Sequence, residues 1–293
     1  MELLVGGVAS GLVLGILYGL LGFGIVLLFK ATGVANFAQG TFSMVLAFVA
    51  YQICVHLGVH IVVAFFISVV VAPVFGAAVY LLVIRPREGA GHLNLTIRTL
   101  ALSMLLVAIV QQLYAANEPY RFPSLFPNET AFRLGSASIT WLNVGSLGVA
   151  AILAAGFAWV FRATDLGLKL LALAERPEIA RMLGINVRRL AVLSWMTASF
   201  VALVVGVLLA PTTLLSSRMA DPYLLISFTA VVIGGLTSLP GALVGGVVVG
   251  LIDSITSLYW NADVSLFLIF VLFLLFLLFR PNGLFGVSVA ERL

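Results

Sequence analysis

The chain has very little charge for its length. Only 9% of its 293 residues are Asp, Glu, Lys or Arg, whereas 62% are hydrophobic. A soluble domain usually carries roughly 25% charged residues, so this composition excludes a typical water-soluble protein. The net charge of +4 is too small to indicate a partner nucleic acid. The composition therefore predicts an integral membrane protein, in which basic residues mainly mark the cytoplasmic loops.

Motifs for nucleotide, metal and catalytic chemistry are also missing. The sequence contains neither a G-x-x-x-x-G-K-[S/T] phosphate loop nor an H-E-x-x-H zinc motif. The sequence contains three isolated histidines, His56, His60 and His92. His56 and His60 are four residues apart and could share a helix face, but no third ligand is available to complete a metal site. The single cysteine, Cys54, cannot form an intramolecular disulfide. We therefore expect no enzyme activity, no metal site and no cofactor bound by this chain.

Nine apolar runs are long enough, or nearly so, to cross a bilayer, which takes roughly 17–25 mostly apolar residues. The region 221–258 is interrupted by GGLTSLPGA at 234–242, and two short helices are expected there rather than one long helix. The sequence thus predicts an all-α polytopic helical bundle of eight or nine transmembrane segments, some of them broken by Gly and Pro. The runs cover residues 4–29, 33–55, 59–84, 97–115, 141–161, 190–211, 221–236, 242–258 and 262–280.

Basic residues orient these runs across the membrane. The connections 85–98 and 162–189 are both rich in Lys and Arg, and two runs separate them, so both are expected in the cytoplasm. Nine crossings also place Arg280 there, with the N-terminus outside, whereas eight would place Arg280 outside unless 221–258 re-enters the membrane. The connection 116–140 is then external. It is either a simple surface loop or a docking surface or lid for an external partner.

Two glycine-rich breaks carry polar residues at membrane depth, ANFAQGTFS at 35–43 and GGLTSLPGA at 234–242. Unpaired backbone groups are costly in hydrocarbon, so such breaks are tolerated only where they line a cavity or are buried in protein. The glycines either allow close helix packing or flank a translocation path. On the second hypothesis, the path residues are Asn36, Phe37, Gln39, Gly40, Gly234, Gly235, Thr237, Ser238, Pro240 and Gly241.

The charged stretch AERPEIARMLGINVRRLAV, at 174–192, predicts a short cytoplasmic helix over 177–183. Pro177 suits the first turn of a helix, because its missing N–H would be unpaired there. Gly184 suits the position just past the end of a helix, where φ is often positive.

One side of this short helix is apolar, because Ile179, Met182 and Leu183 are spaced i, i+3 and i+4. A helix of two turns is not stable alone in water, so it must lie against something. The pattern leaves two supports open, namely an anionic lipid surface and the groove of a partner protein.

The segment EIARMLG within this stretch resembles the E-A-A-x-x-x-G core of the cytoplasmic loop of ABC importer permeases. In that family the loop forms a coupling helix that docks on the ATPase subunit. The resemblance departs from the core at Ile179, where the family has Ala, and this change extends the apolar stripe. The coupling residues that the resemblance implies are Glu178, Ile179, Ala180, Arg181, Met182, Leu183 and Gly184.

Longer strings are similar to the branched-chain amino acid permease family of the LivH and LivM type. They are GVANFAQGTFSM, LGLKLLALAERPEIARMLGINVRRL, LLAPTTLLSSRM and VIGGLTSLPGALVGGVVVG, and the first looks more like the LivH side. The resemblance implies one permease domain over 1–293 in the bacterial cytoplasmic (inner) membrane. Its partners would be a LivM-like second permease subunit or a second copy, two ATP-binding subunits, an external solute-binding protein and membrane lipid. ATP would be used by the partner subunits.

The function implied by the resemblance is import of branched-chain or related hydrophobic amino acids by ATP-driven alternating access. Import of urea, short amides or small carboxylates by the same class of transporter stays open. An ATP-independent secondary carrier would need ion-coupling side chains within the spans, and Asp253 is the one candidate. Asp253 is either an anchor near the membrane surface or part of a pathway. A membrane scaffold would not need two broken, polar segments.

Overall fold

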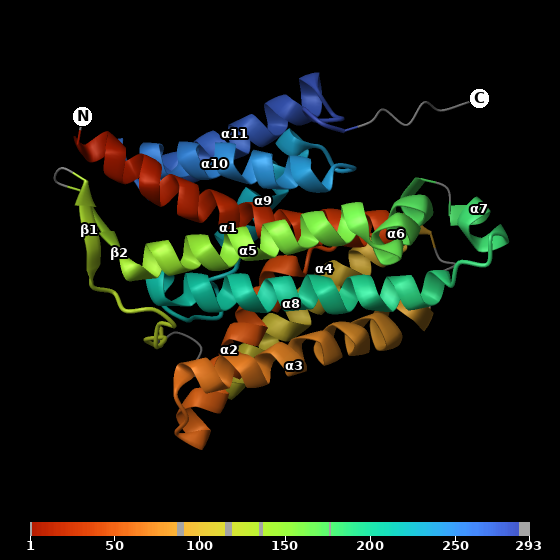
Figure 1. Cartoon of the computed structure of the whole chain (residues 1–293), viewed down its shortest axis with the longest axis horizontal. Coiled ribbons are helices and arrows are strands. Elements are labelled where there is room, and N and C mark those ends of the chain that lie inside the picture. The colour runs from red at the N-terminus through yellow and green to blue at the C-terminus, as the bar shows by residue number, and fades with distance from the viewer. Residues whose placement is uncertain (1, 87–90, 115–118, 135–136, 176, 287–293) are drawn as a thin grey trace. The chain divides into compact units, whose positions relative to one another are not determined.

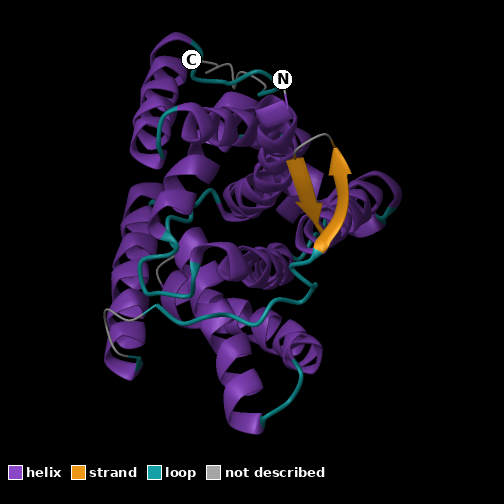
Figure 2. Ribbon diagram, turned by 90° about the vertical axis from the view of Figure 1, so that its left-hand side faces the viewer, coloured by secondary structure: helices purple, strands orange, loops and turns teal. Residues whose placement is uncertain are grey.

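The computed structural model describes residues 2–86, 91–114, 119–134, 137–175 and 177–286. The chain divides into two compact units, which we describe separately. The first unit comprises Met1–Val26, Glu129–Ala154 and Leu225–Leu293, and the second comprises Leu27–Asn128 and Ala155–Leu224. Helices make up nearly all of the described chain, as Figure 2 shows.

Eight helices of the described residues are long and apolar enough to cross a membrane, which confirms the all-α polytopic prediction (Figure 1). A further apolar helix, α9 (Asp221–Gly234), has 14 residues. Its length of about 21 Å is shorter than a hydrocarbon core of about 30 Å. The eight long helices are α1 (Glu2–Thr32), α2 (Gln39–Leu57), α3 (Ile61–Val79) with its π-helical continuation η1 (Tyr80–Ile84), α4 (His92–Leu113), α5 (Trp141–Ala163), α8 (Val187–Thr213), α10 (Leu239–Tyr259) and α11 (Ala262–Phe279).

The region 221–258 contains two helices as predicted, but only the first of them is short. The second, α10, has 21 residues and begins at Leu239, three residues before the apolar run expected at 242. The reason is local, since Ser238 accepts a hydrogen bond from the N–H of Gly241 and so caps the helix. Pro240 fits the first turn, where its missing N–H leaves no intrahelical bond unmade.

The outer connection holds a β-hairpin that the sequence pattern did not predict. Strands β1 (Thr130–Leu134) and β2 (Ala137–Thr140) pair antiparallel in the first unit. Their paired residues include Thr130 with Thr140 and Phe132 with Ile139, which are β-branched or aromatic and favour strands. The hairpin is too short to give a clear alternating pattern, and neighbouring prolines made the segment resemble a loop.

In the first unit, α1 packs on α10 through facing glycines. A Cβ atom added at Gly250 would lie 2.2 Å from the Cα of Gly15, and one added at Gly246 would lie 2.4 Å from the Cα of Gly19. Only glycine permits this approach of two backbones, which maximises van der Waals contact between helices in a membrane.

Asp253 of α10 also joins the helices of the first unit. The hydroxyl of Tyr18, on α1, donates to Asp253 Oδ2 at 2.8 Å, and the hydroxyl of Ser265, on α11, donates to Oδ1 at 2.6 Å. Tyr18 and Ser265 are both buried. These contacts make Asp253 a link between three helices of the first unit. The two roles considered from the sequence, an anchor near the membrane surface and a pathway residue, stay predictions.

We expect Asp253→Leu to lower the thermal stability of the detergent-solubilised protein. The substitution removes the carboxylate that accepts from two buried hydroxyls, and Ser265 keeps only its longer bond of 3.3 Å to the backbone carbonyl of residue 253. The loss of a hydrogen bond by a buried group costs about 1–3 kcal/mol. Asp253→Asn keeps one carbonyl acceptor and should cost less. Asp263→Asn, at an exposed aspartate in the first turn of α11, is the matched control. An unchanged melting temperature for Asp253→Leu would show that the carboxylate does not hold these helices.

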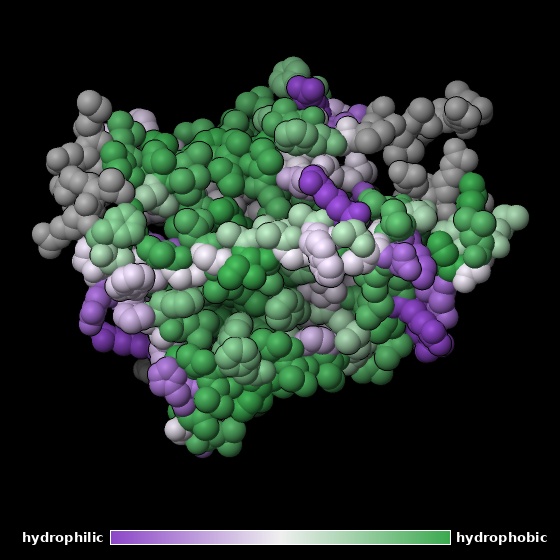
Figure 3. All heavy atoms as spheres, viewed as in Figure 1, coloured by the Kyte–Doolittle hydropathy of each residue, from purple (hydrophilic) through white to green (hydrophobic). Residues whose placement is uncertain are grey.

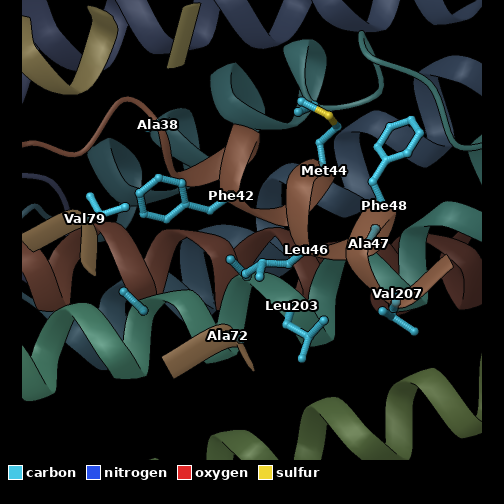
Figure 4. Close-up of a cluster of buried hydrophobic side chains, with 14 of the residues drawn as sticks. Ala38, Phe42, Met44, Leu46, Ala47, Phe48, Ala72, Val79, Leu203 and Val207 are labelled. Atoms are coloured by element: carbon cyan, nitrogen blue, oxygen red, sulfur yellow. The ribbon is translucent and has the colours of Figure 1, made fainter. Parts of the chain in front are cut away.

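The core of the second unit lies between α2, α3 and α8. Figure 4 shows Leu46 of α2 close to Leu203 of α8, and the ring of Phe42 pointing toward Val79 of α3. The outward face of α3 carries large apolar side chains, and apolar atoms cover this part of the visible surface in Figure 3. Hydrophilic atoms gather instead near the connection between α7 and α8. The second unit therefore has a helical core and an apolar exterior suited to lipid.

Candidate coupling segment and helix breaks

The chain between α5 and α8, which includes most of the charged stretch, forms two short helices in the second unit. Helix α6 (Asp165–Glu175) was not predicted, although Leu166, Leu170 and Leu173 follow the i, i+4, i+7 spacing of an amphipathic helix. Helix α7 (Pro177–Met182) agrees with the predicted helix over 177–183 to within one residue. Both helices precede α8 directly in the chain.

The ends of α7 match the chemistry expected from its sequence. Pro177 is the first residue of the helix. Gly184 has a φ of 78°, the left-handed conformation that glycine adopts without strain. The N–H of Leu183 donates to the carbonyl of Ile179, and the N–H of Ile185 donates to the carbonyl of Ala180, both at 3.0 Å. These bonds close the helix end and turn the chain toward α8.

The two faces of α7 differ in burial. Ala180 is only 1% exposed and lies on the side that packs against α6 and α8. The predicted apolar stripe points outward, with exposed fractions of 43% for Ile179, 86% for Met182 and 73% for Leu183. The side chains of the two charged coupling residues, Glu178 and Arg181, lie outside the described part of the chain.

The first helix break, residues 33–38 before α2, is closed by its own polar side chains. The carbonyl oxygen of the Asn36 side chain accepts a bond from the N–H of Ala38, and its amide donates to Gln39 Oε1 at 3.1 Å. The amide of Gln39 in turn donates to the carbonyl of Ala198 on α8 at 2.9 Å. Asn36 and Gln39 are fully buried. The break is thus held inside protein, where a broken helix is tolerated.

Side chains of α4 complete this network, and the sequence argument did not find them. Thr99 Oγ1 accepts a bond from the N–H of Phe37 at 3.1 Å. The hydroxyls of Thr41 and Ser103 lie 2.6 Å apart. Thr99 and Ser103 are four residues apart in an apolar run, so their helical spacing was the available signal. Gly40 lets α2 approach the carbonyl of Ala220, to which an added Cβ would lie 3.1 Å away.

The second break, in the first unit, is a tight turn between α9 and α10. Gly235 has a φ of 106°. A Cβ added at Gly234 would lie 2.0 Å from the carbonyl oxygen of Gly241, so neither position admits a side chain without movement. Thr237 and Ser238 are partly buried, and Pro240 is exposed.

The chain that follows α11 returns to this turn. The N–H of Leu284 donates to the carbonyl of Ile233 at 2.8 Å, and the N–H of Phe285 donates to the carbonyl of Gly234 at 3.1 Å. The turn therefore lies at the same end of the first unit as the segment after Arg280, the end that basic residues assign to the cytoplasm. Because the two breaks belong to different units, a path lined by both stays a prediction.

Comparisons with known proteins agree with this architecture. The family described as "Branched-chain amino acid transport system / permease component" matches residues 7–277. The chain is similar to the high-affinity branched-chain amino acid transport system permease protein LivH of Escherichia coli K12, with 28% identity over 97% of this chain and 96% of that protein. It is also similar to BraD of Pseudomonas aeruginosa, with 26% identity over the same shares of the two chains.

A solved structure, PsaBC from Streptococcus pneumoniae in complex with Fab, matches with a TM-score of 0.50 and 18% identity over 96% of this chain and 93% of that chain. At this identity the likeness concerns the fold alone. The family match covers nearly all of the apolar runs, both breaks and the α6–α7 insert. The chain therefore belongs to the permease component family of branched-chain amino acid transport systems.

Proposed function

We propose that this chain is the transmembrane permease subunit of a binding-protein-dependent ABC importer. It moves branched-chain or related hydrophobic amino acids across the bacterial cytoplasmic membrane by ATP-driven alternating access. The observation that carries this proposal is the family match over residues 7–277, together with relatives whose names describe branched-chain amino acid transport permeases. The eight apolar helices place the protein in the membrane as a multi-pass chain. The residues 1–293 would act as one permease domain.

The proposed importer needs partners, because its permease family contributes transport and not ATP hydrolysis. Two ATP-binding subunits would bind and hydrolyse ATP, and an external binding protein would deliver the solute. The second permease would be a LivM-like chain or another copy of this one. A secondary carrier is less well supported, because Asp253 is occupied by two hydroxyl donors within its own unit.

The coupling role is assigned to α7. Its outward stripe of Ile179, Met182 and Leu183 leaves a large apolar surface exposed on a helix too short to be stable alone. A groove on an ATP-binding subunit would cover this stripe, in the way that amphipathic helices bind grooves through spaced anchors. Because α8 begins at Val187, a displacement of α7 is passed within a few residues to the central helix of the second unit.

The translocation path remains a proposal in two parts. In the second unit, Asn36, Phe37, Gln39 and Gly40 would face the solute once α2 moves relative to α8, because the bond from Gln39 to Ala198 then breaks. In the first unit, the turn between α9 and α10 would contribute Gly234, Gly235, Thr237, Ser238, Pro240 and Gly241.

The proposed function is tested by reconstituting the permease with its ATP-binding subunits and binding protein in liposomes. We expect uptake of radiolabelled leucine that requires ATP, and co-purification of the ATP-binding subunits in mild detergent. Leucine uptake by this chain alone, without ATP, would contradict the proposal.

The docking stripe can be tested separately. We expect the double substitution Ile179→Asp and Leu183→Asp to weaken binding of the ATP-binding subunits at least about tenfold, because anchors in such interfaces contribute about 2 kcal/mol or more each. Both side chains are exposed in the permease, so its own folding should not change. The conservative pair Ile179→Leu and Leu183→Met is the control and should bind normally. Equal co-purification of the aspartate variant would show that the subunits dock elsewhere.

A further inference from the structure

A short external segment of the second unit crosses the outer ends of its helices. This segment, residues 119–126, follows α4 and precedes the β-hairpin, and we call it the outer strap. Two backbone hydrogen bonds fasten it to the connection between α8 and α9. The N–H of Tyr120 donates to the carbonyl of Leu215 at 2.8 Å, and the N–H of Leu215 donates to the carbonyl of Tyr120 at 2.9 Å. Leu215 is fully buried beneath this bridge.

Aromatic rings reinforce the attachment of the strap. Tyr120 lies 5.6 Å from Tyr51 and 6.2 Å from Phe48, in the second half and at the middle of α2, and 6.1 Å from Tyr114 at the end of α4. Phe122 lies 6.3 Å from Tyr51 and is buried. These distances, between ring centroids, are within the range of favourable aromatic pairs. The strap thus joins α2 to the ends of α4 and α8.

The polar groups of this cluster are partly removed from water. Burial, together with the neighbouring Tyr120 and Tyr51, raises the pKa of the Tyr114 hydroxyl above its usual value.

The backbone next to the bridge is strained. Leu214, just after α8, has a φ of 65° and a ψ of 140°, and it is the one non-glycine residue with positive φ in the described chain. A side chain in this region of φ and ψ is unfavourable and persists only where surrounding contacts impose it. The bridge from Tyr120 to Leu215 is the adjacent contact, so opening the bridge would let Leu214 relax.

We propose that the outer strap is the outward gate of the second unit and that its bridge must open for solute to enter. The inference rests on the proposed function, since a gate has meaning only in a transporter that alternates between two conformations. Two hydrogen bonds, the ring contacts and the buried Phe122 hold the strap, with Leu125 packed against the same core, and the strain at Leu214 opposes this attachment. A purely structural staple would have no need for the strained residue beside it.

A reversible cross-link tests the gate. Tyr120 and Leu215 form a hydrogen-bonded antiparallel pair, whose Cα atoms are about 5.5 Å apart and so suit a disulfide. We expect Tyr120→Cys with Leu215→Cys, in a Cys54→Ser background, to lose at least 90% of ATP-dependent leucine uptake on oxidation in the complete importer. Reduction with dithiothreitol should restore uptake to the level before oxidation. Because each variant is compared with itself, the lost tyrosine ring does not confound the result.

The matched control places a disulfide on the same side of the membrane, where no opening is proposed. Phe132→Cys and Ile139→Cys in the same background join the paired strands of the hairpin. Oxidation should leave the uptake of this control unchanged. Full uptake by the oxidised strap variant, with the cross-link verified by mass spectrometry, would overturn the gate.

A second measurement tests, in the absence of solute, whether the outer strap opens. Phe122→Cys in the Cys54→Ser background places a thiol at a buried position of the strap. Its labelling by a membrane-impermeant maleimide should differ at least fivefold between the nucleotide-free and ATP-bound importer. Equal labelling rates in the two states would overturn the gate. If the importer with Cys54→Ser and no added cysteine fails to take up leucine, the proposed function is contradicted, and the labelling rates alone decide the strap.

Discussion

Replacing Gly184 by proline will abolish ATP-dependent uptake while the permease still inserts into the membrane. Gly184 has a φ of 78°, whereas proline is restricted to about −65°, so the turn from α7 to α8 cannot keep its geometry. An incompatible proline costs about 3 kcal/mol, which corresponds to roughly a hundredfold change in an equilibrium. We expect the substitution to change the orientation of α7 and to leave α8 intact. Helix α8 begins after Gly184 and has its own cap, in which Asn186 Oδ1 accepts a hydrogen bond from the N–H of Arg189.

This expectation is measured as leucine uptake and ATP hydrolysis in the same proteoliposomes. We expect that solute no longer stimulates ATP hydrolysis, whether or not the basal rate of hydrolysis also falls. Leucine uptake should drop by about two orders of magnitude. Gly184→Asn is the matched control, because asparagine tolerates the left-handed conformation and should keep most of the uptake. Normal uptake and normal stimulation in the proline variant would remove α7 from the coupling role.

Replacing Gly206 by valine will prevent the second unit from packing. A Cβ atom at Gly206 of α8 would lie 2.1 Å from the carbonyl oxygen of Ser43 on α2, so even the first side-chain carbon overlaps the neighbouring backbone. Overpacking a core costs typically 1–3 kcal/mol where flexible side chains can yield, and here a helix backbone must move instead. We expect little folded protein or a melting temperature lowered by at least about 10 °C.

Gly148→Val is the control for this substitution. Gly148 lies inside α5, and an added Cβ meets nothing within 4 Å in this chain. Thermal melting and size-exclusion chromatography in detergent compare the two variants at equal expression. Similar behaviour of Gly206→Val and Gly148→Val would mean that α2 and α8 approach less closely than the structure shows.

Much of the fold was predictable, because hydrophobic length and glycine or proline signals are local properties. The apolar runs predicted the long helices. Pro177 and Gly184 set the bounds of α7, and its exposed apolar stripe follows from the spacing of Ile179, Met182 and Leu183. The start of α10 and the β-hairpin were not predicted. Capping by Ser238 and the pairing of two short strands leave little trace in the pattern of apolar residues.

In the candidate sites, too, local features were predictable from the sequence and long-range contacts were not. The amino-acid sequence by itself determined that the chain lies in a membrane and where its family resemblance lies, because these depend on composition and on residues close together in the chain. It also predicted which loops face the cytoplasm. Only the tertiary structure decided that Gln39 bonds to Ala198, that Asp253 joins three helices and that Tyr120 is bridged to Leu215. These partners are far apart in sequence. Which polar side chains meet depends on how the helices pack, and the local sequence pattern does not contain this information.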